Sequence, residues 1–200
     1  MKKVLFSLSA LFALGFANAQ DTATATEGFK AGDTFMSGTV SFDSQKSGDF
    51  KNTTFKFTPS VGYFVTENIA LGVSLGYTNS DNDYTESGYN EKTNTLSADI
   101  FGRYYFNPGS KFTVFGQLDL GYSTSKRESY GFDSYDINGF GAAVAPGINY
   151  WVSSHLALEA SFGILGYATA KPDYYDAEST DVFSIGLDLS NVNFGLIYKF

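Results

Sequence analysis

Cysteine is absent from this chain of 200 residues, which excludes disulfides, thiol chemistry and cysteine-type zinc sites. It also excludes a lipoprotein anchor, which is built on a cysteine. Proline and methionine are scarce, at 4 and 2 residues. Beyond the N-terminus, no stretch approaches the roughly 18 consecutive apolar residues of a membrane-spanning helix. The chain is therefore expected either to stay outside the bilayer or to cross it as strands.

Positive charge is also limited. Lys and Arg number 13 against 21 Asp and Glu, a formal net charge of −8. Without Lys2 and Lys3, which lie in a predicted export signal, the balance becomes 11 against 21, or −10. Phosphate binding needs a concentrated basic face, and this sequence has none. A nucleic acid partner is therefore not expected.

The first residues have the pattern of an export signal. Met1-Lys2-Lys3 is the positive start, residues 4–16 are the apolar run, and Ala17-Asn18-Ala19 is a small-x-small cleavage site. A transmembrane anchor is the alternative, but about a dozen apolar residues are too few to span a bilayer as a helix. We predict a signal peptide over residues 1–19, cleaved after Ala19. Residues 20–33 are Thr/Ala-rich without periodicity, which predicts a flexible periplasmic lead-in.

Aromatic residues and glycine are abundant, at 18% of the chain and 21 residues, a composition typical of strands and turns. From Phe35 onward the chain repeats a run of about ten residues with period-two hydrophobicity, followed by a turn. Eight runs predict an all-β fold, an eight-stranded antiparallel up-and-down transmembrane β-barrel over residues 34–200. The runs fall near residues 34–43, 53–64, 69–78, 94–106, 111–123, 137–151, 155–167 and 182–200.

Each run has an apolar and a polar face, because successive side chains of a strand point to opposite sides. A water-soluble barrel would turn the apolar face inward. A membrane barrel is favoured, because aromatic residues on the apolar face gather near strand ends, as in aromatic girdles. The polar face is rich in Gly and Ser, which suit a narrow interior. In the seventh run, the predicted outward residues are Leu156, Leu158, Phe162 and Ile164, and the predicted inward residues are Glu159, Ser161 and Gly163.

The links between the runs alternate in length. Those at residues 65–68, 107–110 and 152–154 are short, whereas those at residues 44–52, 79–93, 124–136 and 168–181 are long and polar. Outer-membrane barrels have short periplasmic turns and long extracellular loops. The pattern therefore predicts that both termini are periplasmic.

The last run alternates up to the final residue, and ending on an unprotected apolar edge would invite aggregation in a soluble protein. Earlier in the same run, the apolar residues Phe183 and Ile185 stand at odd-numbered positions, whereas those at the end of the run stand at even-numbered positions. A β-bulge near Ser190 and Asn191 would restore the outward face, and so would a last loop over residues 182–190. We prefer the bulge.

Three segments resemble the small outer-membrane β-barrel superfamily of the OmpA, OmpX and OmpW type. They are YFVTENIALG at residues 63–72, GRYYF at residues 102–106 and NFGLIYKF at residues 193–200. The resemblance covers the mature chain and identifies no individual member. It implies that the barrel insertion machinery reads a terminal signal made of Phe194, Leu196, Tyr198 and Phe200.

Charged residues on the predicted inward face must pair to be tolerated in a narrow lumen. Arg103, Glu159 and Lys199 are expected at similar depth, near the periplasmic strand ends. A structural ion-pair network is the expected role, and a gate that opens a narrow pore by exchanging partners is the alternative. The inward charged residues are Lys56, Asp99, Arg103, Asp119, Glu159 and Lys199.

Catalytic, cofactor-binding and metal-binding residues are not expected. The one histidine, His155, falls in a short periplasmic turn with no serine placed to use it. Asp99 and Asp119 could form an acid–base pair, but a salt bridge with Arg103 explains them more simply. The acidic segments near residues 81–91 and 173–181 lack the residue order of an EF-hand calcium loop.

The sequence thus predicts a non-enzymatic, monomeric outer-membrane barrel with a side-chain-filled lumen and a role in envelope integrity and surface interaction. Its expected partners are outer-membrane lipids, the insertion machinery and an extracellular ligand at the loops, whose tyrosines suit protein or glycan contact. The alternative function is a narrow porin or an OmpW-like channel for small or hydrophobic solutes.

Overall fold

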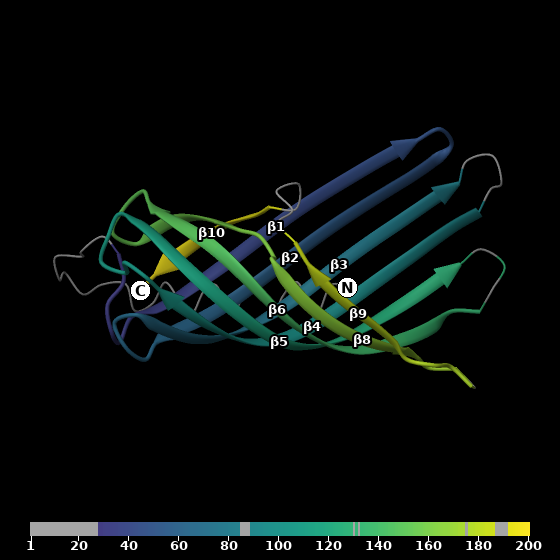
Figure 1. Ribbon diagram of the computed structural model, residues 1–200. Coiled ribbons are helices and arrows are strands. Elements are labelled where there is room, and N and C mark those ends of the chain that lie inside the picture. The colour runs from purple at the N-terminus through teal and green to yellow at the C-terminus, as the bar shows by residue number, and fades with distance from the viewer. Residues whose placement is uncertain (1–27, 85–88, 130, 132, 175, 187–191) are drawn as a thin grey trace.

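The computed structural model describes residues 28–84, 89–129, 131, 133–174, 176–186 and 192–200, which form one antiparallel β-sheet curled into a barrel (Figure 1). Its ten strands are β1 (Thr34–Ser47), β2 (Phe50–Phe64), β3 (Ile69–Tyr84), β4 (Tyr89–Tyr105), β5 (Phe112–Ser129), β6 (Tyr135–Trp151), β7 (Leu156–Ser161), β8 (Leu165–Pro172), β9 (Thr180–Ile185) and β10 (Asn193–Lys199).

Eight positions around the wall hold these strands. β1 to β6 occupy one position each, and each pairs with the next along the chain. β7 and β8 share the seventh position because both pair with β6, and β9 and β10 share the eighth. β10 pairs with β1 and closes the ring. The predicted eight-stranded antiparallel barrel is confirmed.

The outer face of the wall is apolar and the inner face is polar. Along β3, the side chains of Val73 and Leu75 are 56% and 55% exposed, whereas Ser74 between them is 8% exposed. This is the alternation of a strand with its polar side chains turned inward. An apolar surface of this extent rules out the water-soluble alternative. Separately, the described residues contain no helix long and apolar enough to span a membrane.

At the end opposite the short links, the strands extend further than the sequence predicts. β1 and β2 are joined by a turn at Gly48 and Asp49, β3 extends to Tyr84, and β5 extends to Ser129. The predicted long links at residues 44–52, 79–93 and 124–136 are therefore mostly hairpin strand. Ser, Thr and Asn show little alternation of hydrophobicity, yet their backbones complete the antiparallel ladders.

A β-bulge interrupts the seventh wall position between β7 and β8. The pairing of β6 with β7 ends at Gly147 and Ser161, and its pairing with β8 starts at Val144 and Leu165. Three residues of the seventh position therefore face two residues of β6. Pro146 is one of those two, and proline, which cannot donate to a ladder, favours such irregular positions.

The bulge corrects one prediction about which side chains face outward. Because an extra residue reverses the alternation, the outward set beyond the bulge is Leu165 and Tyr167, at 37% and 48% exposed. Phe162 and Ile164 lie within the bulge and do not continue the outward set. At the eighth position, residues 182–185 are strand, and the predicted bulge near Ser190 lies outside the described residues.

Candidate functional site

Aromatic rings close the end of the barrel where the links at residues 65–68, 106–111 and 152–155 lie, here called the short-turn end. Phe29 is at the centre, with its ring stacked on Phe64 at 4.4 Å and edge-on to Trp151 at 4.8 Å between centroids. Tyr105 and Phe35 lie 5.1 and 5.4 Å from the same ring. All five residues are 4% exposed or less. We call them the aromatic plug.

The segment that carries Phe29 is fixed to the barrel on two sides. The backbone N–H of Phe29 donates to the carbonyl of Pro108 at 2.6 Å. Lys199 on β10 forms an ion pair with Asp33 at 3.8 Å and donates to the carbonyl of Gly28. The expected flexible lead-in is therefore corrected for residues 28–33, because burial of an aromatic ring holds this segment in the barrel. Residues 20–27 lie outside the described residues.

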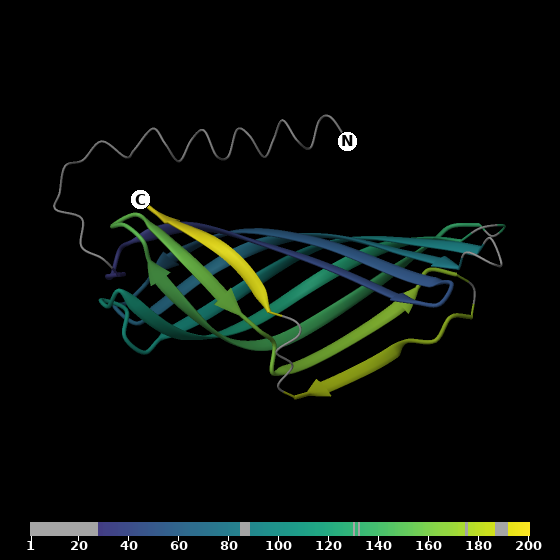
Figure 2. The same cartoon turned by 90° about the horizontal axis from the view of Figure 1, so that it is seen from above.

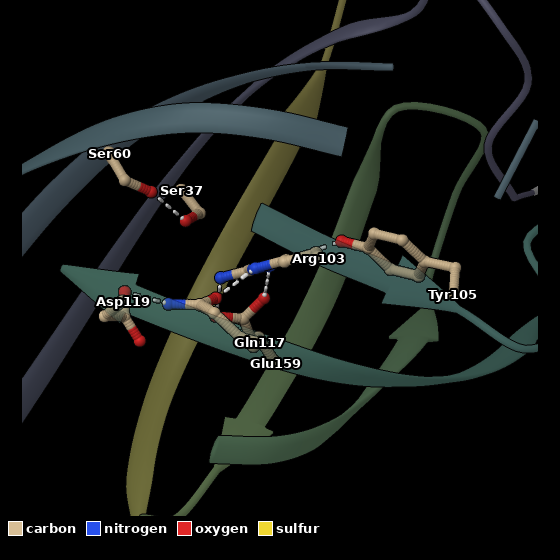
Figure 3. A network of polar contacts seen from close by, with 7 residues as sticks. All are labelled: Ser37, Ser60, Arg103, Tyr105, Gln117, Asp119 and Glu159. Carbon is tan, nitrogen blue, oxygen red and sulfur yellow. Dashed lines mark hydrogen bonds and ion pairs between the residues drawn. The ribbon is translucent and has the colours of Figure 1, made fainter. Parts of the chain in front are cut away.

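Above the plug, a buried ion pair crosses the lumen (Figure 3). Arg103 on β4 meets Glu159 on β7 through two bonds, Nη1 to Oε2 at 2.5 Å and Nη2 to Oε1 at 3.0 Å. The two residues are 5% and 3% exposed. Arg103 also donates to the Tyr105 hydroxyl at 3.2 Å and lies 4.5 Å from the centroid of the Phe115 ring. This bidentate pair, which is specific in geometry, is thus joined to the plug.

The polar contacts continue from the ion pair into a cavity. Arg103 Nε donates to Gln117 Oε1, and Gln117 Nε2 donates to Asp119 Oδ1 at 2.6 Å, as Figure 3 shows. The cavity has a volume of about 320 Å³, so side chains do not fill the lumen along its whole length. Lys199 lies apart, beside Asp33. Five of the six predicted lumen charges line the cavity: Lys56, Asp99, Arg103, Asp119 and Glu159.

In the outer half of the wall, the described residues leave an opening between β1 and β9, which do not pair with each other. β10 pairs with β1 only over residues 35–40, and β9 pairs with β8. Within the described residues, Ser41–Ser47 of β1 pair with β2 alone. We call this opening the seam, and Figure 2 shows β9 at the free side of the β8–β9 hairpin. A cavity of about 1050 Å³ lies there, lined by polar residues and by the apolar Val40, Phe42, Leu165, Ile185 and Phe194.

Three residues of the predicted insertion signal, Phe194, Leu196 and Tyr198, lie on β10, and Phe200 follows its last residue. Phe194 and Leu196 are 66% and 53% exposed on the outer face. Phe200 meets the Tyr198 ring edge-on at 5.2 Å. Their reading by the insertion machinery stays a prediction. The predicted cleavage residues Ala17 and Ala19 lie outside the described residues.

The structure places a serine next to the single histidine, contrary to expectation. Ser154 Oγ lies 3.0 Å from His155 Nδ1 in the turn before β7. The two residues are neighbours in sequence and lie at the short-turn end. In the part of the chain that the structure describes, no group of three or more His, Asp or Glu residues is placed to hold a metal ion.

The aromatic plug is the feature that sequence reasoning missed. Four of its rings, all but Phe29, stand at strand positions on the otherwise polar inward face. Phe64, Tyr105 and Trp151 are each the last residue of a strand before a short link. Phe29 had no such signal, because no strand pattern surrounds it. Asp33, the partner of Lys199, was hidden for the same reason.

The family model described as outer membrane protein beta-barrel domain matches residues 7–200. Among curated proteins, none matches.

Several solved structures share the fold. OprG from Pseudomonas aeruginosa is 18% identical with a TM-score of 0.56, covering 88% of this chain and 99% of its own. The N-terminal β-barrel domain of Pseudomonas aeruginosa OprF is 14% identical with a TM-score of 0.52, covering 86% and 100%. Outer membrane protein W of E. coli is 17% identical with a TM-score of 0.52, covering 86% and 99%. At these identities, the likeness concerns the fold alone.

Proposed function

The chain belongs to the outer membrane protein β-barrel domain family and is a small barrel of the outer membrane, and we propose that it acts there as a sealed, non-conducting barrel in envelope integrity and surface interaction. Proteins of this family are typically not enzymes. No catalytic role is proposed for this chain.

The observation that carries the proposal is the closure of the short-turn end. An ion would have to displace the buried rings of Phe29 and Phe64 and then separate Arg103 from Glu159. Breaking a buried ion pair leaves an uncompensated buried charge, which is strongly unfavourable. The short turns and both termini of the barrel lie at this end, which in outer-membrane barrels faces the periplasm. We therefore place the seal on the periplasmic side.

The test is electrical. The purified, refolded protein is inserted into a planar lipid bilayer, with a porin in the same membrane as positive control, and single-channel current is recorded. We expect no stepwise conductance from the wild-type barrel. Reproducible conductance steps from wild-type protein would overturn the sealed-barrel proposal and favour the ion-pair gate or the porin.

A second candidate, an outlet for hydrophobic solutes, is favoured by the seam. A solute entering the lumen from outside would not need to pass the plug, because the seam cavity lies above it and is lined by both Lys56 and apolar side chains. Phe42 and Ile185, on its two sides, are 69% and 76% exposed. The seam would then release the solute sideways into the bilayer.

A cross-link across the seam tests this candidate, and the absence of native cysteine makes it selective. Ser41→Cys and Ser184→Cys line the same cavity from β1 and β9, and a flexible bis-maleimide reagent would join them. If the seam is an outlet, cross-linking should abolish transfer of a fluorescent fatty acid into vesicles, while the untreated double variant retains it. Equal transfer before and after cross-linking contradicts the outlet.

A further inference from the structure

The barrel wall continues beyond its upper aromatic girdle as a polar sheet. Tyr77 and Tyr122 mark that girdle on the outer faces of β3 and β5, where they are 41% and 43% exposed. The strands extend from there towards the hairpin tips (Figure 1). We call residues 50–56, 78–84, 89–95 and 123–129 the outer extension. Its inner face carries the side chains that alternate with those of its outward face.

Side chains on the inner face of the outer extension stand in registered rows. Neighbours within a row are about 4.8 Å apart, the spacing of strands in a sheet. Several already touch: Asn52 Nδ2 donates to Asn82 Oδ1 at 2.7 Å, and Thr95 and Ser125 hydroxyls lie 2.7 Å apart. The rows are Asn52, Asn82, Glu91 and Ser129; Thr54, Ser80, Thr93 and Arg127; and Lys56, Thr78, Thr95 and Ser125.

The two upper rows have no net charge. Arg127 Nε lies 3.8 Å from Glu91 Oε1, so the acid and the base in these rows face each other. The remaining members are amides and hydroxyls, and all are half-buried. By contrast, the chain as a whole has a net charge of −8. The two upper rows thus form a neutral hydrogen-bonding surface within an acidic protein, with Lys56 in the row below them.

Aromatic rings border this surface on both sides. Phe50 and Tyr84 contact each other at 5.0 Å between centroids, at the tips of β2 and β3. On the opposite side, Tyr135 meets Tyr174 at 5.4 Å, and Arg127 Nη1 donates to the Tyr135 hydroxyl at 3.5 Å. Tyr84 and Tyr174 are 43% and 56% exposed, so part of each side chain faces the solvent.

We propose that the inner face of the outer extension binds an uncharged oligosaccharide. Asn, Ser and Thr side chains both donate and accept hydrogen bonds, as sugar hydroxyls do. After the contacts within the rows are made, each amide keeps further donor or acceptor capacity. The exposed tyrosines offer rigid amphipathic area on which the apolar face of a sugar ring can pack. Acidic glycans and nucleic acids are disfavoured, because no unpaired cation faces them from the two upper rows.

The inference deepens the surface-interaction part of the proposed function. It rests on the proposed function because the outer extension must lie outside the membrane to bind a glycan. Its test is independent of the seal. Conductance would refute the sealed lumen without affecting glycan binding, and failure of glycan binding would leave the sealed lumen standing.

The experiment is an array of neutral and acidic oligosaccharides probed with the full barrel in detergent micelles. We expect retention of neutral glycans, with binding reduced at least tenfold by the double substitution Asn52→Ala and Asn82→Ala. The matched control is Asn79→Ala and Asn94→Ala, since these asparagines are bonded at 3.1 Å on the same sheet but face outward. The control variant should bind like wild type.

Folding is checked for each variant by the shift in electrophoretic mobility on heating, so that a misfolded barrel is recognised. Absence of neutral glycan retention overturns the inference, and so does equal loss in both double variants. Preferential retention of acidic glycans also overturns it. If a peptide library instead binds in a manner that depends on Asn52 and Asn82, the face is a peptide site and not a sugar site.

Discussion

At the scale of single residues, the buried ion pair between Arg103 and Glu159 is the most demanding feature of the barrel. Each charge loses its water on entering the lumen, and this loss is offset only if the partner and further hydrogen bonds are in place. Tyr105 and Gln117 supply those bonds to the guanidinium. The ion pair therefore depends on two other side chains that the fold must bring to the same depth.

Replacing Glu159 with Gln should destabilise the barrel by about 3–5 kcal/mol, because Arg103 is left as a buried charge without its counterion. The measurement is the urea midpoint for unfolding from lipid vesicles. As control, the double variant Arg103→Met and Glu159→Leu should lose less than Glu159→Gln alone, since no charge remains buried. A Glu159→Gln midpoint equal to that of wild type would show that the pair contributes no stability.

At the scale of elements, aromatic rings opposite glycines set the register of neighbouring strands. In each case the ring lies on the inner face over a residue that has no side chain, and an added Cβ would overlap the ring. Such pairs use glycine where another group approaches the backbone closely. The pairs are Phe35 with Gly62 between β1 and β2, Phe101 with Gly72 between β3 and β4, and Phe115 with Gly147 between β5 and β6.

Gly147→Ala tests one of these contacts. We expect a loss of about 1–3 kcal/mol, the usual cost of overpacking, because the new methyl group meets the Phe115 ring. Gly116→Ala in the facing strand is the control, since nothing lies within 4 Å of a Cβ there, and it should be neutral. Urea unfolding of both variants measures the difference. Equal midpoints would mean that the ring moves aside without cost.

The seam predicts that β9 is the least protected strand of the wall. An edge strand has one unpaired row of backbone groups, and local opening follows low contact density. All six residues of β9 are exposed. In hydrogen exchange of the barrel in lipid nanodiscs, β9 amides should exchange much faster than those of residues 35–40 of β1, which are paired on both sides. Comparable protection of both segments would argue for a closed seam.

At the scale of the whole molecule, the barrel is organised along its axis. The plug and ion pair close one end, a polar cavity lies above them, and the outer extension stands beyond the girdle. The outward face follows the same order, with an apolar belt below the girdle and polar side chains above it. Burial in lipid is what makes this arrangement stable.

The extent of the apolar belt along the barrel axis can be tested by introducing an arginine at two positions of the outer face. Leu118→Arg, on the outer face of β5 below Tyr122, should cost about 2–4 kcal/mol, as for a cation near the bilayer midplane. Thr124→Arg, on the same face above Tyr122, should cost about 0–1 kcal/mol. Folding free energies in lipid vesicles give both values. Similar costs at the two positions would place the membrane boundary elsewhere.

Period-two hydrophobicity, a local property of each strand, was enough to predict eight wall positions, the apolar outer face and most inward charges. Local patterns also predicted the short links, since turn residues act over a few positions. Local patterns did not predict the outer ends of the strands, such as residues 79–84, because the residues there are polar on both faces and their hydrophobicity does not alternate.

The contacts that close the short-turn end, and the missing pairing at the seam, depend on the tertiary structure alone. Phe29 reaches Trp151, and Arg103 reaches Glu159, only because the ring closes and sets every register around it. The bulge between β7 and β8 and the seam beside β9 also result from the pairing of distant strands. The apolar wall follows from residue order, and the export signal is a prediction from the same source. The plug, the lumen ion pair and the seam depend on how eight pairings add up around a closed sheet.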